Sequence, residues 1–282
     1  MLPVGLCVQL ACVWEATARK PGNVHRYRDF EDASYLDFIL SAAAIAPVLE
    51  GATERPVGQT ILKAVQATHR VARTNTNLGI LLLLSPLAAV PISESLREGL
   101  LRVLDGLDVA DARAAYEAIR LANPGGLGRV PEQDVGDEPT QSLRGVMALA
   151  ADRDLIARQY VNGFEQVFEE GVPALRQALD QGATLEGAII ACHLTLLARH
   201  PDSLIVRKRG PDEAHEGSRR AQHVLDAGWT SGRGDWDALE KFDSWLREEG
   251  HTRNPGTTAD LVAACLFVGL REGAVAAHHR FC

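Results

Sequence analysis

The sequence predicts an all-α fold, and three observations support this. Alanine and leucine dominate the apolar stretches, strand-like alternation of β-branched residues is scarce, and Gly and Pro punctuate the stretches at helix-length intervals. The 282 residues are 46% hydrophobic and 23% charged, which is ordinary for a globular protein able to bury a sizeable core. We therefore expect one domain over residues 1–282, a multi-helix bundle with several fully buried helices.

Helix starts and stops follow local chemistry. The residue before a proline avoids α geometry, so the first helix ends before Pro21 and another ends before Pro201. The irregular segment 121–139 is a long functional loop or a boundary between two halves, and we favour the loop. In chain order, the predicted helices are Gly5–Arg19, Ala33–Leu49, Pro56–Arg73, Leu78–Val90, Ser93–Gly106, Val109–Ala122, Gln141–Arg153, Ile156–Gln181, Thr184–His200, Glu213–Ala227, Asp235–Glu249 and Ala259–Ala277.

Three stretches, Leu78–Val90, Thr184–Leu197 and Leu261–Leu270, are apolar on every side. A helix that is apolar all round must be buried. Each has a polar cluster at one end, and the first helix also ends in the polar segment Lys20–Arg26. If these helices pack in one bundle, their polar ends converge on one pocket over an apolar floor, the usual form of a small-molecule site.

Two of these clusters precede a helix, where unpaired N–H groups and a partial positive charge favour phosphate oxygens. The alternative is plain capping, because Thr, Asn and Asp are good N-caps. Lysine and arginine side chains are available to complete a phosphate site. The predicted phosphate-binding and nucleotide-binding residues are Lys20, Gly22, Asn23, Asn75, Thr76, Asn77, Arg207, Lys208, Arg209, Asn254, Gly256, Thr257 and Thr258.

Glu15, Asp202 and Asp260 are carboxylates at or beside buried segments, and we predict that they are catalytic residues. An unpaired buried charge is costly, so each needs a cation. Asp202 and Asp260 are the candidate ligands of Mg²⁺, which carboxylates, water and substrate phosphates usually hold. Salt bridges to Lys20 and Arg207 are the alternative.

Composition excludes several classes of function. The net charge of −8 argues against a nucleic-acid partner, and the absence of an unbroken apolar run of membrane-spanning length argues against a membrane protein. We expect Leu2–Val13 to be the first buried helix rather than a signal peptide. Five cysteines without metal-ligand spacing indicate reduced thiols in a cytoplasmic protein. A homo-oligomer is compatible with the sequence.

The order of these motifs resembles the triphosphoribosyl-dephospho-CoA synthase family. The similarity rests on Glu15 followed by Lys20-Pro21-Gly22-Asn23-Val24, then Asn75-Thr76, Asp202 and finally Asn254-Pro255-Gly256-Thr257-Thr258-Ala259-Asp260-Leu261. The resemblance implies an all-helical transferase that moves the triphosphoribosyl group of ATP onto dephospho-CoA and releases adenine. It further implies ATP as substrate with Mg²⁺, Asp260 or Asp202 as base or metal ligand, and phosphates held by Lys20 and the asparagine turns.

The chain departs from the family pattern at three places, which are residues 73–79, Pro201-Asp202-Ser203-Leu204 in place of Gly-Asp-Thr-Asn, and Gly256-Thr257-Thr258-Ala259-Asp260 in place of Gly-Gly-Ser-Ala-Asp. Where the family typically reads Gly-Val-Asn-Thr-His-Lys-Gly, residues 73–79 lack the histidine and the lysine. This version resembles a branch from methanogenic and methylotrophic one-carbon metabolism. The alternatives are therefore a related nucleotide-dependent enzyme of tetrahydromethanopterin-type cofactor synthesis and a non-catalytic helical protein that binds a nucleotide or a CoA-like ligand.

Overall fold

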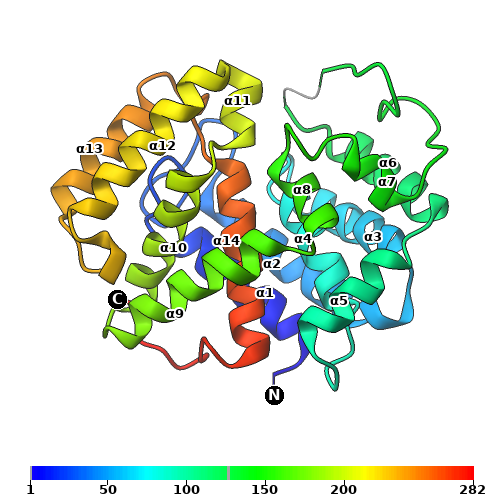
Figure 1. The fold of residues 1–282 in the computed structure, drawn as a ribbon, viewed down its shortest axis with the longest axis horizontal. Helices are drawn as coiled ribbons and strands as arrows, with labels where there is room; N and C mark the ends of the chain where they lie inside the picture. The colour runs from blue at the N-terminus through cyan, green and yellow to red at the C-terminus, as the bar shows by residue number, and fades with distance from the viewer. Residues whose placement is uncertain (1, 126–127) are drawn as a thin grey trace. The chain divides into compact units, whose positions relative to one another are not determined.

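The computed structural model describes residues 2–125 and 128–282 and confirms the all-α prediction (Figure 1). Within these ranges no β-strand forms, and the one β pairing is an isolated bridge between His25 and Arg28. The chain divides into two compact units, Met1–Cys12 with Leu36–Phe164 and Val13–Tyr35 with Glu165–Cys282. The prediction of a single domain over residues 1–282 stays a prediction.

In the first unit, α4 is the central apolar helix, with buried side chains at nearly every position. It packs against α3, which in turn packs against α6. Helix α6 starts with a reciprocal capping box between Asp108 and Asp111. Helix α1, Val4–Thr17, begins in this unit and ends in the second. The other helices of the first unit are α2 (Tyr35–Glu50), η1 (Ala52–Glu54), α3 (Val57–His69), α4 (Leu78–Ala88), α5 (Leu96–Asp105), α6 (Val109–Ala122), α7 (Leu143–Ala148) and α8 (Leu155–Asn162).

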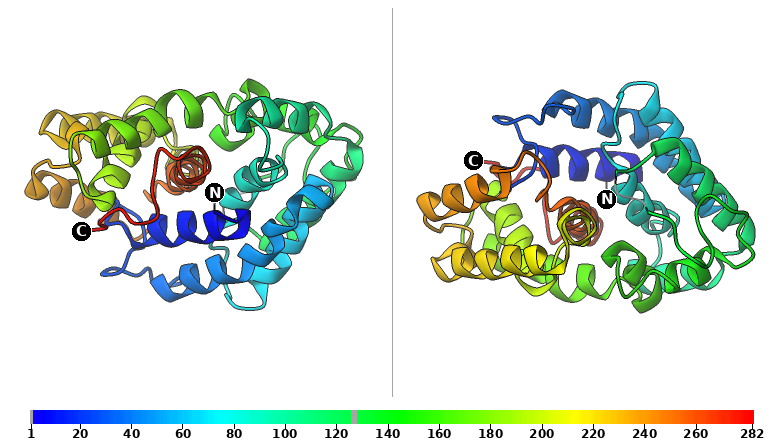
Figure 2. Two further views of the ribbon diagram at one scale, coloured as in Figure 1. Left: turned by 90° about the horizontal axis from the view of Figure 1, so that it is seen from below. Right: turned by 90° about the horizontal axis from the view of Figure 1, so that it is seen from above.

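In the second unit, α10 and α14 form the interior. Figure 2 views α14 nearly end-on, and α14 packs against α9, α10 and α11. A core of buried apolar side chains from α10 to α13 includes Ile190, Trp229 and Leu246. The helices are η2 (Gln166–Gly171), α9 (Val172–Asp180), α10 (Leu185–Arg199), α11 (Ser203–Arg209), α12 (Pro211–Asp226), η3 (Trp229–Ser231), α13 (Trp236–Arg247) and α14 (Gly256–Glu272).

Several helix predictions were wrong in detail, among them Gln141–Arg153, where α7 covers only Leu143–Ala148. The predicted helix Ile156–Gln181 is broken, because Gly163 and Phe164 take positive φ angles of 71° and 63° and end α8. Helix α11 was missed, although Asp202 begins it as a side-chain N-cap. Helix α14 starts at Gly256, three positions before the predicted Ala259.

The predicted burial of the apolar stretches is confirmed. Leu81, Ile189 and Val262, one from each stretch, are completely buried. Cys7, Cys12, Cys192 and Cys265 are buried, Cys282 is exposed, and none of the five forms a disulfide. No described helix is both long and apolar enough to cross a bilayer. Gly126 and Leu127 of the predicted loop 121–139 lie outside the described residues.

Candidate functional site

Lys20 lies in the turn that follows α1 and is completely buried. Its Nζ lies 2.8 Å from Glu15 Oε1 and also donates a hydrogen bond to the Glu15 carbonyl oxygen. Glu15 is itself buried. The two predicted site residues therefore form a buried ion pair, which was the alternative to a phosphate contact for Lys20.

Gly22 has a structural reason to be glycine. Its φ is +76°, and a Cβ built there would lie 2.8 Å from both Leu246 Cδ1 and Pro255 Cδ. Its N–H donates to Asp243 Oδ1 at 2.7 Å. The backbone of this turn thus packs directly against α13 and against the turn that leads into α14.

Asn23 joins the two motif turns. Its Nδ2 donates to Asn254 Oδ1 at 2.7 Å, and its carbonyl accepts a hydrogen bond from Arg247 Nη2. The Asn23 Oδ1 atom is buried and meets no hydrogen-bond partner among the described residues. The Lys20–Asn23 turn and the Asn254 turn are therefore in contact, which joins two of the four polar ends that were predicted to converge on one pocket. The convergence of all four stays a prediction.

Asp202 is completely buried, and each of its oxygens accepts two hydrogen bonds. Oδ1 accepts from the N–H groups of Leu204 and Ile205 at 2.8 and 3.2 Å, and Oδ2 accepts from Thr258 N and Oγ1 at 2.7 and 2.8 Å. One carboxylate thus caps α11 and the first turn of α14. Burial raises the pKa of Asp202, while the donors from Thr258 and α11 oppose that change.

These contacts decide how well Asp202 suits a metal ion. Four donors occupy its lone pairs, so the carboxylate has none to offer Mg²⁺ in this arrangement. Among the described residues, no group of three or more His, Cys, Asp or Glu side chains is placed to hold a metal. Asp202 does not fit the predicted role of a magnesium ligand.

Asp260 differs from the other two carboxylates because it is partly exposed. It lies more than one turn inside α14, whose first turn is Gly256 to Ala259. Asp260 is therefore not an N-cap residue. Thr257 and Thr258 are buried in that first turn, and the Gly256 N–H donates to the Asn254 carbonyl at 2.9 Å. Several of the donors predicted for phosphate thus already have partners in the protein.

The basic run Arg207, Lys208 and Arg209 forms the last turn of α11. Arg209 pairs with Glu249 at 2.7 Å, and Lys208 Nζ donates to the His251 carbonyl at 3.4 Å. Burial lowers the pKa of Lys208. This run is at the opposite end of α11 from Asp202.

The remaining predicted residues, Asn75, Thr76 and Asn77, belong to the first unit and precede α4. Asn75 Oδ1 accepts a hydrogen bond from the Leu78 N–H at 3.0 Å, and Thr76 Oγ1 lies 2.8 Å from the hydroxyl of Ser41. Asn77 Nδ2 donates to Thr68 Oγ1 at 3.0 Å. The capping alternative thus accounts for Asn75.

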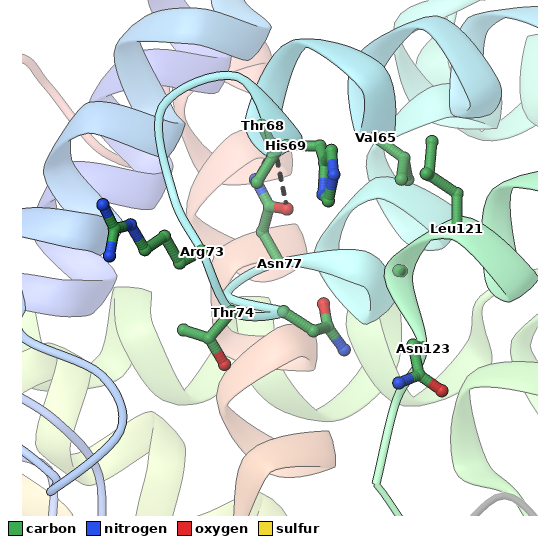
Figure 3. Close-up of a pocket in the computed structure, with 10 residues that line it drawn as sticks. Val65, Thr68, His69, Arg73, Thr74, Asn77, Leu121 and Asn123 are labelled. Atoms are coloured by element: carbon green, nitrogen blue, oxygen red, sulfur yellow. Dashed lines mark hydrogen bonds between the residues drawn. The ribbon is translucent and has the colours of Figure 1, made fainter.

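A cavity of about 400 Å³ lies beside this turn (Figure 3). Sequence reasoning found the polar turn Arg73–Asn77 but missed the rest of the lining, which comes from the ends of α3 and α6. The signals available were His69 at the end of α3 and Asn123, an asparagine that can close a helix in the left-handed conformation. The complete lining is Val65, Thr68, His69, Arg73, Thr74, Asn75, Asn77, Leu121, Ala122 and Asn123.

Sequence reasoning also missed polar partners in the second unit. The Asp243 carboxylate accepts a hydrogen bond from the Gly22 N–H. It also forms a salt bridge of 2.8 Å with Arg247, one turn later on α13. The imidazole of His25 is buried nearby. Burial, followed by the charges of Arg247 and Lys20, lowers its pKa to about 4. The spacing of Asp243 and Arg247 was the one sequence signal for this cluster.

Comparisons with known proteins converge on one family. The sequence model for ATP:dephospho-CoA triphosphoribosyl transferase matches residues 2–278. A Pseudomonas savastanoi pv. phaseolicola protein assigned as a 2-(5''-triphosphoribosyl)-3'-dephosphocoenzyme-A synthase is 28% identical over 168 residues, which are 58% of this chain and 55% of that protein. A Malonomonas rubra protein with the same assignment is 23% identical over 277 residues, covering 92% of this chain and 84% of its own length.

A solved structure agrees with these sequence matches. It is the crystal structure of an Archaeoglobus fulgidus protein assigned as a triphosphoribosyl-dephospho-CoA synthase, with a TM-score of 0.65 and 27% sequence identity. The superposition covers 83% of this chain and 99% of the other. The chain spans about half the length of the first curated relatives that it matches, at 55%, 55% and 58%.

Proposed function

The chain belongs to the ATP:dephospho-CoA triphosphoribosyl transferase family, and from this premise we propose that it transfers the triphosphoribosyl group of ATP to a dephospho-CoA-like acceptor and releases adenine. The single observation that supports this most is the contact between Asn23 and Asn254, at 2.7 Å. It joins the two motifs on which the family resemblance depends, although 231 residues separate them. Two remote polar turns held together at the end of a buried helix are suited to a substrate site.

In the proposed reaction, the bond between the ribose C1 of ATP and adenine breaks, and the acceptor hydroxyl oxygen bonds to C1. The hydroxyl proton passes to a base, and the leaving adenine takes up a proton. Such a transfer passes through an oxocarbenium-like state that a nearby carboxylate stabilises. Asp260 is the candidate base because it is partly exposed. Glu15 and Asp202 are buried and act as positioning residues for the two turns.

Mg²⁺ remains part of the proposal as the counter-ion of ATP. A magnesium ion of this kind is usually bound by substrate phosphates, water and one or two carboxylates, and its charge offsets that of the triphosphate. Asp260 is the carboxylate proposed to approach it. Asp202 is excluded from this role by its four donors.

The acceptor is the part of the proposal that the sequence leaves most open. Asn77 and Leu78 stand where the family typically has histidine and lysine. This departure favours a second candidate, in which the same nucleotide chemistry serves one-carbon cofactor synthesis. We propose a cytoplasmic location for either activity, because none of the cysteines forms a disulfide and the substrate is ATP.

The test is the release of adenine from ATP with Mg²⁺, measured by chromatography with and without dephospho-CoA. Adenine that forms only with dephospho-CoA, together with a product of the combined mass, would support the transferase. Adenine formed equally without acceptor would indicate a hydrolase. No adenine under either condition, with ATP binding still detectable by calorimetry, would contradict the transferase and favour a binding protein.

A further inference from the structure

The cavity in the first unit has the composition of a site for a neutral, flat, polar ligand. Its volume of about 400 Å³ is within the range of small-molecule pockets. None of the described residues that line it is a carboxylate, and Arg73 is the one side chain of fixed charge among them. Figure 3 shows that Arg73 points away from the space around which His69, Asn77 and Asn123 lie.

The groups that remain are amides, hydroxyls and an imidazole over an apolar wall. Val65, Leu121 and Ala122 supply the apolar surface. Asn75 and Asn123 are exposed to solvent at the cavity, and neither the Asn123 amide nor the His69 ring makes a hydrogen bond to a described residue. Donor and acceptor groups that are not engaged within the protein are available to a ligand.

We propose that this cavity binds the adenine moiety of a substrate. An asparagine amide offers one donor and one acceptor in a plane, which matches the N6 and N7 edge of adenine. The apolar wall suits the face of a purine ring. This inference rests on the proposed function for the choice of ligand, because ATP and dephospho-CoA both carry adenine. It replaces the predicted phosphate role of Asn75 and Asn77 with recognition of the base.

The first experiment titrates adenosine into the whole protein by isothermal calorimetry, because adenosine carries the base without phosphate. The main variant is Ala122→Leu, which fills the cavity from the last residue of α6. Its matched control is Ala148→Leu, because Ala148 is the last residue of α7 and does not line the cavity. We expect affinity for adenosine to fall at least tenfold in Ala122→Leu and to stay within twofold in Ala148→Leu.

A second variant tests the proposal independently, in case Ala122→Leu does not fold. Asn123 has a φ of 44° and closes α6 in the left-handed conformation, which glycine adopts without strain. Asn123→Gly therefore removes only the amide, and we expect a loss of affinity of about fivefold, the usual effect of one hydrogen bond. Circular dichroism confirms that each variant is folded. Equal affinities in the wild type, Ala122→Leu and Asn123→Gly would overturn the proposal.

Further titrations separate the two sources of adenine. ATP and dephospho-CoA are each measured against wild type and Ala122→Leu, and the substrate that loses affinity is the one whose base occupies the cavity. Inorganic tripolyphosphate and 4'-phosphopantetheine are the probes that lack adenine, and we expect neither to displace adenosine. Displacement by tripolyphosphate, or unchanged affinity for both substrates in Ala122→Leu, would overturn the adenine assignment.

The outcome is distinguishable from failure of the proposed function. If wild type releases adenine from ATP but its adenosine affinity is insensitive to Ala122→Leu, the cavity assignment alone is wrong. If adenosine binds and Ala122→Leu weakens it while no adenine is released, the cavity assignment stands and the transferase proposal is wrong.

Discussion

The carboxylate of Asp202 accepts two hydrogen bonds from Thr258, 56 residues further along the chain. The N–H and the hydroxyl of Thr258 lie 2.7 and 2.8 Å from the same oxygen. Because the other oxygen caps α11, this one side chain fixes the start of one helix against the start of another. The position of the Asn254 turn therefore depends on a residue that lies outside it.

Replacement of Asp202 by asparagine should destabilise the protein. Asparagine has one acceptor oxygen, so its amide NH₂ would face two of the four donors. The variant no longer pays for a buried negative charge, which offsets part of the cost of the lost hydrogen bonds. We therefore expect a net loss of about 2 kcal/mol in the free energy of unfolding. The control is Asp235→Asn at the exposed N-cap of α13, expected within about 0.5 kcal/mol of wild type. Equal urea midpoints for the two variants would contradict this role for Asp202.

Removal of the Lys20 ammonium alone should lower the free energy of unfolding more than removal of both Lys20 and Glu15 charges. Lys20→Met leaves Glu15 as an uncompensated buried charge, which typically costs about 3 to 5 kcal/mol. The double variant Glu15→Leu with Lys20→Met removes both charges and should recover part of that stability. Urea unfolding of the two single variants and the double variant completes the cycle. A Lys20→Met protein as stable as wild type would return Lys20 to the phosphate-binding candidates.

Asp260→Asn separates catalysis from stability. Asp260 is inside α14 and partly exposed, so we expect a change of less than about 1 kcal/mol in the free energy of unfolding. As a general base, it should account for roughly a hundredfold or more in turnover. Adenine release is compared with Glu272→Gln, which removes a charge from the other end of the same helix. Turnover within about twofold of wild type in Asp260→Asn would remove it from the mechanism.

Lowering the pH should reduce the free energy of unfolding, because His25 is harder to protonate in the folded protein than in the unfolded chain. Its pKa is lowered to about 4 by burial and by Arg247 and Lys20, whereas the ordinary value is 6.5. Between these values the unfolded chain binds a proton that the folded chain does not, so stability falls as pH falls from 6.5 to 4, by about 3 kcal/mol at most.

His25→Asn provides the control for this effect. Asparagine keeps an acceptor near the position of Nδ1, which accepts the Tyr27 N–H at 3.2 Å, but does not titrate. We expect its free energy of unfolding to depend less on pH than that of wild type between pH 4 and 6.5. Parallel pH profiles for the two proteins would show that His25 is not responsible. Burial also lowers the pKa of His193, so the variant should retain part of the dependence.

The sequence was sufficient to predict the buried helices. A stretch such as Leu261–Leu270, apolar on all sides, has no stable position except the interior, and this is where α14 lies. The break at Gly163 was not predictable from apolar periodicity, because the apolar residues continue on both sides of it. Helix α11 was missed because it is short and directly follows Pro201.

The candidate site was predicted only in part. The contact between the Asn23 and Asn254 turns agrees with the predicted grouping, but their partners Asp243 and Arg247 carry no motif of their own. The predicted place of Asn75, Thr76 and Asn77 in the same group stays a prediction. Local chemistry predicts that Asp202 is a good cap, yet it does not reveal that the same carboxylate also binds Thr258. The cavity escaped prediction because the end of α6 must meet the end of α3 and the turn before α4, which lie far from it in the sequence.

The discontinuous second unit sets the order of events during biosynthesis. The turn that contains Gly22 leaves the ribosome long before its partner Asp243, which follows 221 residues later. At typical rates of synthesis this delay is about 10 to 45 s. Throughout that interval the Gly22 N–H lacks the carboxylate that accepts it in the folded protein. Translation that stops before Asp243 leaves that turn without its native anchor.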